Sequence, residues 1–285
     1  MAFVNYLIHL AILIGIYSIL TISLNIAVGF TGLLNLGHIA FFGIGAYTSA
    51  LLALAGVPIW LSLLGGMILA GLFGILLAFP TTRLKCDYLA LTTLGFTFIM
   101  GSVARNWTGL TRGALGIPGI QRLAVSNYQM LLIVVILSAI VYAIIHFLTI
   151  SRYGRIMQAV RDDELAAKTL GHDALLTKAL ALGISAFFAG LSGGLYAHYI
   201  TFIDPSIFSL TDLILVFSMM IVGGLGSIKG SYIGTAILLL IPEPLRFIGF
   251  PSSLIGPARQ ILFALILLLI LLYRPKGIFG KVDLN

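Results

Sequence analysis

Charged residues are scarce in this chain. Only 9% of its 285 residues are Asp, Glu, Lys or Arg, whereas 60% are hydrophobic, and the mean hydropathy is +1.14. A water-soluble domain carries about 25% charged residues, so this composition excludes a chain that exposes most of its surface to water. Residues 1–82 contain no Asp, Glu, Lys or Arg. We therefore expect most of the chain to lie in lipid.

The chain lacks the residues and motifs that several kinds of functional site require. The single cysteine, Cys86, excludes an intrachain disulfide and a thiol metal site. The chain has no G-x-x-x-x-G-K-[ST] phosphate loop, no H-E-x-x-H and no G-x-S-x-G motif. We therefore predict that it is not an enzyme, binds no metal or other cofactor and does not hydrolyse ATP itself. The net charge of +7 comes from basic residues spread between apolar runs, which indicates membrane-flanking charge and not nucleic-acid binding.

Long apolar runs are abundant. They are continuous and do not alternate with polar residues, which favours membrane helices over barrel strands. No basic stretch precedes the first run, so we take it as a retained span and not a cleaved signal. We predict an all-α polytopic membrane protein, one transmembrane domain over residues 1–285, with eight to ten transmembrane helices. The runs lie at 6–28, 38–56, 60–80, 88–104, 128–149, 179–200, 210–228, 230–248 and 257–273.

Basic residues near membrane ends favour the cytoplasm. The loop 150–178 is the longest hydrophilic stretch with dense charge, while Arg83 and Lys85 form a short basic loop and residues 273–281 a basic tail. Placing all three inside gives a cytoplasmic C-terminus and leaves the 105–127 loop outside. That loop carries three arginines and no acid, so it either meets acidic groups of an external partner or is simply solvated. The arginines are Arg105, Arg112 and Arg122.

Two apolar segments are interrupted by glycine and polar residues. "VGFTG" at 28–32 and "VGGLG" at 222–226 share a V-G-x-x-G core, which is a weak internal two-fold repeat. Paired glycine-interrupted segments indicate broken or re-entrant helices beside a transport path, because freed backbone groups are tolerated only inside the protein or beside water. The alternative is close helix packing, and an intramembrane histidine is often an interhelical hydrogen-bonding group. The predicted translocation residues are Gly29, Thr31, Gly32, Asn35, His38, Gly223, Gly224 and Gly226.

The 150–178 loop has a helical pattern of its own. Ile156, Val160 and Leu165 can share an apolar face. Acidic residues at 162–164 suit the first turn of a short helix that stops at Gly171. Such a helix either fits a groove on a soluble partner or is an ordinary solvated loop helix.

The chain resembles the permease subunits of branched-chain amino acid ABC importers, in particular the LivM-like members. The segments that carry the resemblance extend over nearly the whole chain and are specific in combination. They are "AVGFTGLLNLGHIAFFGIGAYTSALL" (27–52), "RLKCDYLALTTLGF" (83–96), "RYGRIMQAVRDDELAAKTLG" (152–171), "AFFAGLSGGLYAHYITFIDP" (186–205), "VGGLGSIKGSYIGTAIL" (222–238) and "YRPKGIFG" (273–280).

The resemblance implies a permease of a bacterial or archaeal plasma (inner) membrane that translocates branched-chain or other neutral hydrophobic amino acids by alternating access. It also implies the partners: two cytoplasmic ATPase subunits that use ATP and Mg, a homologous LivH-like second permease, and an extracytoplasmic solute-binding protein. Residues 161–171 would be the coupling helix. Its residues are similar to the E-A-A signature of ABC importers, although Leu165 separates the glutamate from the alanines. The implied coupling residues are Arg161, Asp162, Glu164, Ala166, Ala167 and Gly171.

Two other functions are compatible with the sequence. One is a related importer for urea or short amides. The other is a secondary transporter or channel that works alone, which the broken helices allow but which leaves the 150–178 loop without a partner.

Overall fold

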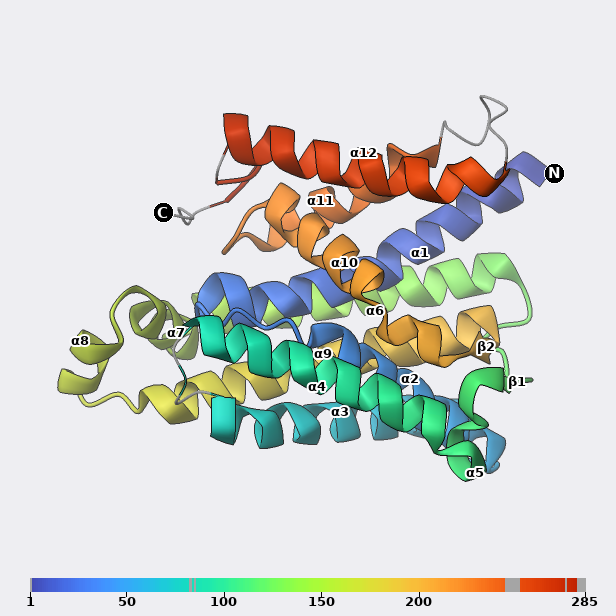
Figure 1. Cartoon of the computed structure of the whole chain (residues 1–285), viewed down its shortest axis with the longest axis horizontal. Coiled ribbons are helices and arrows are strands. Elements are labelled where there is room, and N and C mark those ends of the chain that lie inside the picture. The colour runs from blue at the N-terminus through green and yellow to red at the C-terminus, as the bar shows by residue number, and fades with distance from the viewer. Residues whose placement is uncertain (1, 82–83, 85, 244–251, 275, 281–285) are drawn as a thin grey trace.

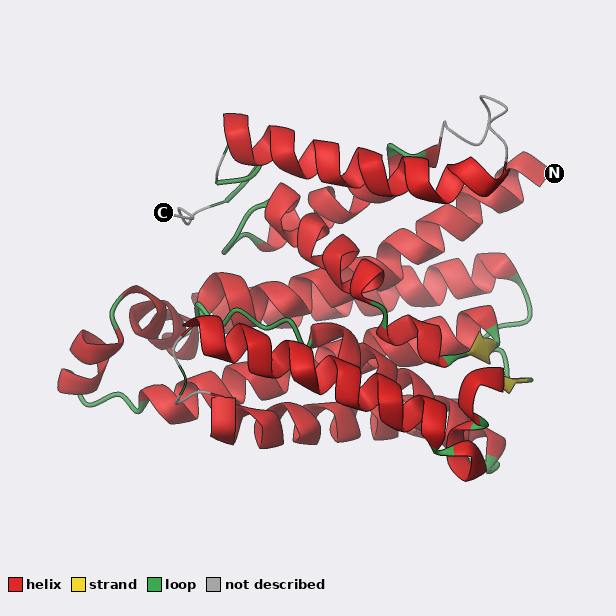
Figure 2. Cartoon of the chain, viewed as in Figure 1, coloured by secondary structure: helices red, strands yellow, loops and turns green. Residues whose placement is uncertain are grey.

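The computed structural model describes residues 2–81, 84, 86–243, 252–274 and 276–280. The predicted basic loop residues Arg83 and Lys85 and the last tail residue Lys281 lie outside these ranges. Helices make up almost all of the described chain, and the only sheet found there is a pair of two-residue strands (Figure 2). The all-α prediction is thus confirmed.

The elements follow the apolar runs of the sequence. The α-helices are α1 Ala2–Asn25, α2 His38–Leu54, α3 Ile59–Thr81, α4 Cys86–Asn106, α5 Thr108–Thr111, α6 Asn127–Ile150, α7 Arg152–Asp162, α8 Glu164–Thr169, α9 Ala174–Ile200, α10 Leu210–Gly223, α11 Ile228–Leu240 and α12 Ser252–Tyr273. The shorter turns and strands are η1 Ile26–Phe30, η2 Gly113–Leu115, β1 Ile117–Pro118, β2 Phe202–Ile203 and η3 Pro205–Phe208.

Five helical segments in the described part of the chain are long and apolar enough to cross a membrane: Val4–Phe30, Ile59–Thr81, Asp87–Asn106, Asn127–Ile150 and Ala174–Ile200. Four shorter apolar helices lie at His38–Leu54, Leu210–Gly223, Ile228–Leu240 and Gly256–Ile270. Each predicted apolar run therefore contains an apolar helix, as expected of a multi-pass membrane protein. The number that cross the bilayer stays a prediction.

The longer helices run along the same general direction and give the bundle two ends (Figure 1). One end carries α7 and α8, together with the end of α12. The opposite end carries α5 and the antiparallel pair β1–β2, in which Ile117 faces Ile203. The chain thus places its charged loop and its arginine-rich loop at opposite ends.

Helix α1 is the core of the bundle. It packs against α6, α9, α10 and α11, and Ile12, Ile16 and Ile19 are fully buried. Two serine hydroxyls of α9 donate to α1 carbonyls: Ser185 to Ser23 O at 2.6 Å and Ser192 to Ile16 O at 2.7 Å. Such bonds hold membrane helices together, because apolar burial alone gives little drive between helices in lipid.

Outer helices turn apolar side chains outward. Leu76 on α3 is 65% exposed, Phe147 on α6 is 67% exposed and Leu272 on α12 is 69% exposed. Apolar faces of this extent suit contact with lipid or another protein and not with water.

Small residues let α2, α3 and α9 approach closely. A Cβ added at Gly193 of α9 would overlap the carbonyl oxygen of Phe42 on α2, and one at Gly45 would overlap the backbone of Gly190. The packing interpretation of the glycines is therefore correct for this three-helix contact.

We expect Gly193→Ala to lower the thermal unfolding temperature of the detergent-purified protein, because the new methyl group must push α2 and α9 apart. Overpacking of this kind costs about 1–3 kcal/mol. Gly95→Ala on α4 is the matched control: no atom lies within 4 Å of its added Cβ, so its unfolding temperature should be unchanged or higher. Equal behaviour of the two variants would contradict the close-packing account.

Candidate functional site

The first glycine-rich segment is a true break in a helix. Helix α1 passes into the π-helical turn Ile26–Phe30, residues 32–35 are non-helical, and α2 begins at His38. Gly32 has φ +70°, a conformation that costs little only for glycine. Thr31 and Asn35 are 2% and 0% exposed, so most of this irregular backbone lies inside the protein, where such backbone is tolerated.

Side chains satisfy the freed backbone groups of this break. Thr31 Oγ1 donates to Ala27 O at 2.6 Å. On α4, Thr93 Oγ1 accepts from Leu36 N at 3.0 Å, and Thr97 Oγ1 donates to Leu36 O at 3.2 Å. The predicted residue Thr31 therefore stabilises the break itself, and so do Thr93 and Thr97 of α4, which were not predicted.

His38 lies between two helices. Its ring is 1% exposed, and Nε2 is 3.0 Å from Ser23 Oγ and 3.1 Å from Leu20 O, both on α1. Because a carbonyl can only accept, the bond to Leu20 O places the proton on Nε2. This geometry supports the interhelical interpretation of His38.

The second glycine-rich segment is also a break. Helix α10 ends at Gly223 and α11 begins at Ile228. Gly226 has φ +71°, nearly the value at Gly32, and Gly224 has φ +112°. The two V-G-x-x-G copies therefore place their last glycine in the same left-handed conformation, so the weak repeat seen in the sequence has a structural counterpart.

Asn25 joins the two breaks. It is fully buried at the end of α1, and its Oδ1 accepts from Gly226 N at 2.9 Å. Its Nδ2 donates to Ser231 Oγ at 2.7 Å and to the carbonyls of Gly224 and Ser227 at 3.2 Å each. The two breaks are thus in direct contact, and one amide side chain supplies partners to the second.

Residues 278–279, near the C-terminus, also supply hydrogen bonds to the second break. Ile278 N donates to Val222 O and Phe279 N to Gly223 O, both at 3.0 Å. These are terminal carbonyls of α10, which lack partners inside the helix. The tail motif at 273–280 is therefore part of the site.

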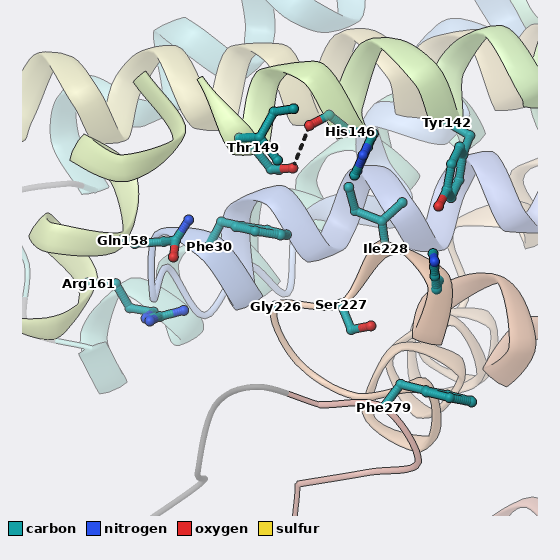
Figure 3. Close-up of a pocket in the computed structure, with 12 residues that line it drawn as sticks. Phe30, Tyr142, His146, Thr149, Gln158, Arg161, Gly226, Ser227, Ile228 and Phe279 are labelled. Carbon is teal, nitrogen blue, oxygen red and sulfur yellow. Dashed lines mark hydrogen bonds between the residues drawn. The ribbon is translucent and has the colours of Figure 1, made fainter. Parts of the chain in front are cut away.

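A cavity of about 590 Å³ adjoins both breaks at the α7 end of the bundle (Figure 3). Among the eight predicted translocation residues, only Gly226 lines it. Among the described residues no acidic side chain lines it, and the lining consists of Phe30, Tyr142, His146, Thr149, Ile150, Gln158, Arg161, Gly226, Ser227, Ile228, Lys229 and Phe279.

The charged loop folds as two helices, α7 and α8, whereas its pattern predicted one short helix that stops at Gly171. Asp163 caps α8, since its Oδ1 accepts from Leu165 N at 2.9 Å and from Ala166 N at 3.0 Å. Gly171 ends it with φ +87°, and His172 N donates to Ala167 O at 3.1 Å. The acidic start and glycine stop read from the sequence are both present.

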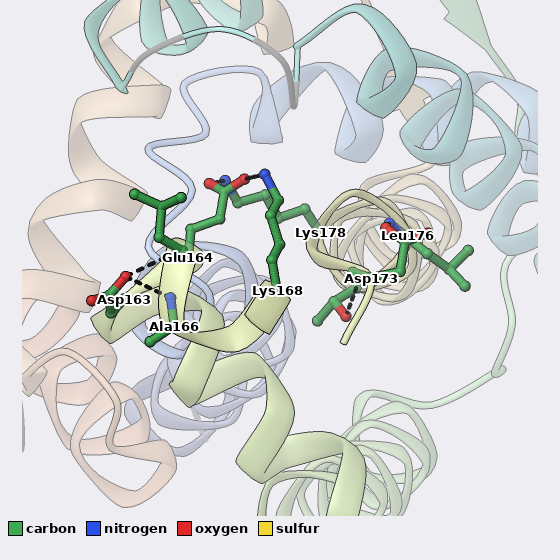
Figure 4. A network of polar contacts seen from close by, with 9 residues as sticks. Asp163, Glu164, Ala166, Lys168, Asp173, Leu176 and Lys178 are labelled. Atoms are coloured by element: carbon green, nitrogen blue, oxygen red, sulfur yellow. Dashed lines mark hydrogen bonds and ion pairs between the residues drawn. The ribbon is translucent and has the colours of Figure 1, made fainter. Parts of the chain in front are cut away.

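An ion-pair network ties α8 to α9 (Figure 4). Glu164 lies 2.7 Å from Lys168 Nζ and 2.5 Å from Lys178 Nζ. Hydrogen bonds from Lys168 and then Lys178 hold the pKa of the Glu164 carboxyl below its usual value. Glu164 therefore orients α8.

The apolar face of this loop differs from the prediction. Val160 packs with Ala167 and Ala174, and Ile156 lies against them, but Leu165 is 76% exposed. The prediction that Leu165 shares their face was wrong, because the cap at Asp163 starts a new helix and resets the period. Leu165 and the 75%-exposed Leu170 are left pointing outward.

The six predicted coupling residues differ in exposure. Asp162, Ala166 and Gly171 are exposed, Glu164 is partly buried and Ala167 is buried. Arg161 instead turns inward: its Nη1 donates to Gly29 O at 2.8 Å in the first break, and Asp162 Oδ1 accepts from its Nε at 2.8 Å. Asn25 and this inward role of Arg161 were missed by the sequence analysis, where the only signal was an amide four residues before Gly29.

A known protein family matches most of this chain. Residues 6–272 match the family described as the permease component of branched-chain amino acid transport systems. Within the described chain, no group of three or more His, Cys, Asp or Glu side chains is arranged to hold a metal ion.

Named relatives agree with the family match. The chain is 33% identical to the high-affinity branched-chain amino acid transport system permease protein LivM of Escherichia coli (strain K12), over 95% of this chain and 69% of that protein. It is 26% identical to a probable LivM permease of Methanocaldococcus jannaschii, over 94% and 91% of the two chains. It is also 25% identical to the LivH permease of Escherichia coli (strain K12), over 94% and 92%.

These matches confirm the resemblance drawn from the quoted motifs, and they describe a transporter component and not an enzyme. Together with the two joined helix breaks in a multi-pass bundle, they show that the chain belongs to the family of branched-chain amino acid transport system permease components.

Proposed function

We propose that this chain is a transmembrane subunit of an ATP-binding cassette importer that carries branched-chain or other neutral hydrophobic amino acids by alternating access. The observation that carries the proposal is the capped helix α8, in which Leu165, and directly after which Leu170, are about three-quarters exposed at the end of the bundle where both helix breaks meet. The names of the LivM and LivH relatives support the cargo. Urea, amides and stand-alone transport have no comparable support.

Separate subunits supply the energy in this proposal. Two cytoplasmic ATPase subunits use ATP and Mg, and each permease of a pair presents its own coupling helix to one of them. The exposed leucines of α8 enter an apolar groove on the ATPase, the mode in which short amphipathic helices bind. The similarity to both LivM and LivH supports a LivH-like second permease.

The α7–α8 end of the bundle is cytoplasmic in this proposal. The short segment 152–178 holds five basic residues, and such loops remain inside. Because α12 ends at the same end, the C-terminus is cytoplasmic as well. The membrane is the plasma (inner) membrane of a bacterium or archaeon.

Solute leaves through the cavity beside the breaks. Its volume of about 590 Å³ is ample for one amino acid, and its lining combines apolar side chains with Ser227, Thr149 and Lys229. Weak binding is sufficient there, because the external binding protein selects the cargo.

We expect the complex purified through a tag on this chain to take up labelled leucine into proteoliposomes only with its binding protein outside and ATP at the ATPase side. Unlabelled isoleucine and valine should compete, and urea should not. Competition by urea alone would favour the amide importer. Uptake by this chain without ATPase subunits would overturn the proposal.

We expect the double substitution of Leu165 and Leu170 by serine to reduce co-purification of the ATPase subunits about tenfold or more, because two buried leucine contacts of roughly 1.5–3 kcal/mol each are lost. Leu115→Ser is the matched control, since Leu115 is 77% exposed and lies in η2, between α5 and β1. Unchanged co-purification of the double variant, measured by quantitative immunoblot, would exclude α8 as the docking element.

The exposed side chains of Arg105, Arg112 and Arg122 form the docking surface for an acidic face of the binding protein in this proposal. Replacing all three by glutamine should slow association of the binding protein about tenfold at low salt and remove most of its salt dependence. Surface plasmon resonance with the nanodisc-embedded complex measures both quantities, and Arg155→Gln is the control. If the association rate of the binding protein keeps its full salt dependence in the triple variant, the arginines are simply solvated and form no docking surface.

A further inference from the structure

Arg161 lies between the loop proposed to meet the ATPase and the interior of the bundle. It is the last arginine of α7, two residues before the cap of α8, and its side chain is only 17% exposed. We propose that Arg161 and Asn25 are positioning residues that form one mechanical connection, through which movement of α7 and α8 reaches both helix breaks at once. This inference rests on the proposed coupling function.

The first contact of the connection is with Gly29. Its carbonyl oxygen belongs to the π-helical turn, and the next amides along the chain bond to other carbonyls: Gly32 N to Val28 O and Leu33 N to Ala27 O. The Arg161 guanidinium supplies a partner to Gly29 O instead, at 2.8 Å. A hydrogen bond from a charged donor is the strong kind, so α7 cannot move without moving or breaking it.

The aliphatic part of Arg161 makes a second contact. A Cβ placed on Gly32 would lie 3.0 Å from Arg161 Cγ, so the arginine stem rests directly on the positive-φ glycine of the first break. Asp162 holds the guanidinium through bonds to Nε and Nη2, both at 2.8 Å. The side chain is thus fixed in position, which suits the transmission of a small displacement.

The connection continues from the first break to the second. A Cβ on Gly29 would overlap both Asn25 Oδ1 and Gly226 N, so the three groups are in contact with no space between them. Asn25 then bonds to the second break through four partners on residues 224–231. A packed interior shifts between discrete arrangements and does not stretch, so displacement of Gly29 is passed to Gly226.

The connection also gives α7 a path to the second break. The break at 224–227 has no contact with α7 of its own among the described hydrogen bonds, yet it lines the cavity through Gly226 and Ser227. Asn25 gives it the same mechanical input as the first break. Movement of one loop can therefore open or close the cavity from two sides.

The central test is Arg161→Met, which keeps the aliphatic stem and removes the donors. In the reconstituted complex we expect basal ATP hydrolysis within about twofold of the original, and a fall of about tenfold in solute transported per ATP, the effect of losing one hydrogen bond from a charged donor. Arg161→Lys keeps a cationic donor and should restore most of the coupling. Arg152→Met, an exposed arginine at the start of the same helix, should behave as the original.

A second readout separates transmission from folding. Hydrogen exchange should rise in residues 224–231 of Arg161→Met, although Arg161 has no hydrogen bond there, while exchange in α3 stays unchanged. Asn25→Asp, which removes the amide donors and keeps the oxygen acceptor, should also reduce transport per ATP. The double variant should be no worse than the more severe single one, because both act on one connection.

The outcomes distinguish this inference from the function on which it rests. If the original complex shows no ATP-driven uptake, the proposed function fails. If the original couples transport to ATP and Arg161→Met couples it equally well, or if the effects of the two variants are additive, the connection through Arg161 and Asn25 is wrong while the function stands. Loss of thermal stability in Arg161→Met and Arg161→Lys alike would assign Arg161 to folding alone.

Discussion

The pairing of backbone groups in an apolar interior is the constraint on which this structure depends. A helix satisfies its own amides and carbonyls, and a break exposes them where no water is available to replace the lost bonds. At the first break the new partners are threonine hydroxyls of α4 and the guanidinium of Arg161. At the second they are the amide of Asn25 and the segment at 278–279. Elements far apart in the sequence therefore meet at the breaks because each supplies hydrogen bonds that the breaks lack.

The local features of this arrangement could be predicted from sequence. Glycine clusters interrupt two otherwise continuous apolar runs, and both interruptions are real because only glycine readily adopts the positive φ found at Gly32 and Gly226. Asp163 and Glu164 mark the start of α8 and Gly171 marks its end, because caps act within a single turn. The helices coincide with the apolar runs, because a segment in lipid is stable only when its own backbone groups are hydrogen-bonded, as they are in a helix.

The contacts between distant segments could not be predicted. Asn25 resembles any polar residue that bonds across a membrane bundle, and its partners lie 199 to 206 residues away. Arg161 belongs to a charged loop, and the composition of that loop suggests that its side chains face solvent or a soluble partner. Only the fold brings α7 beneath the first break and turns that side chain inward. Leu165 illustrates the opposite case, in which a pattern continued across a cap assigned an exposed residue to the buried face.

Close approach of the two breaks explains the composition of the repeated V-G-x-x-G core better than flexibility does. Flexibility would require only that glycine permit a turn, which Gly32 and Gly226 already provide. Neither Gly29 nor Gly223 has a positive φ, yet a methyl group on either would overlap a neighbour: Asn25 and Gly226 in one case, Gly230 in the other. These two glycines are therefore required by contact. A site whose parts touch without intervening side chains transmits displacement with little loss, whereas a loose one would absorb it, so the same small residues that permit the breaks suit the connection proposed between them.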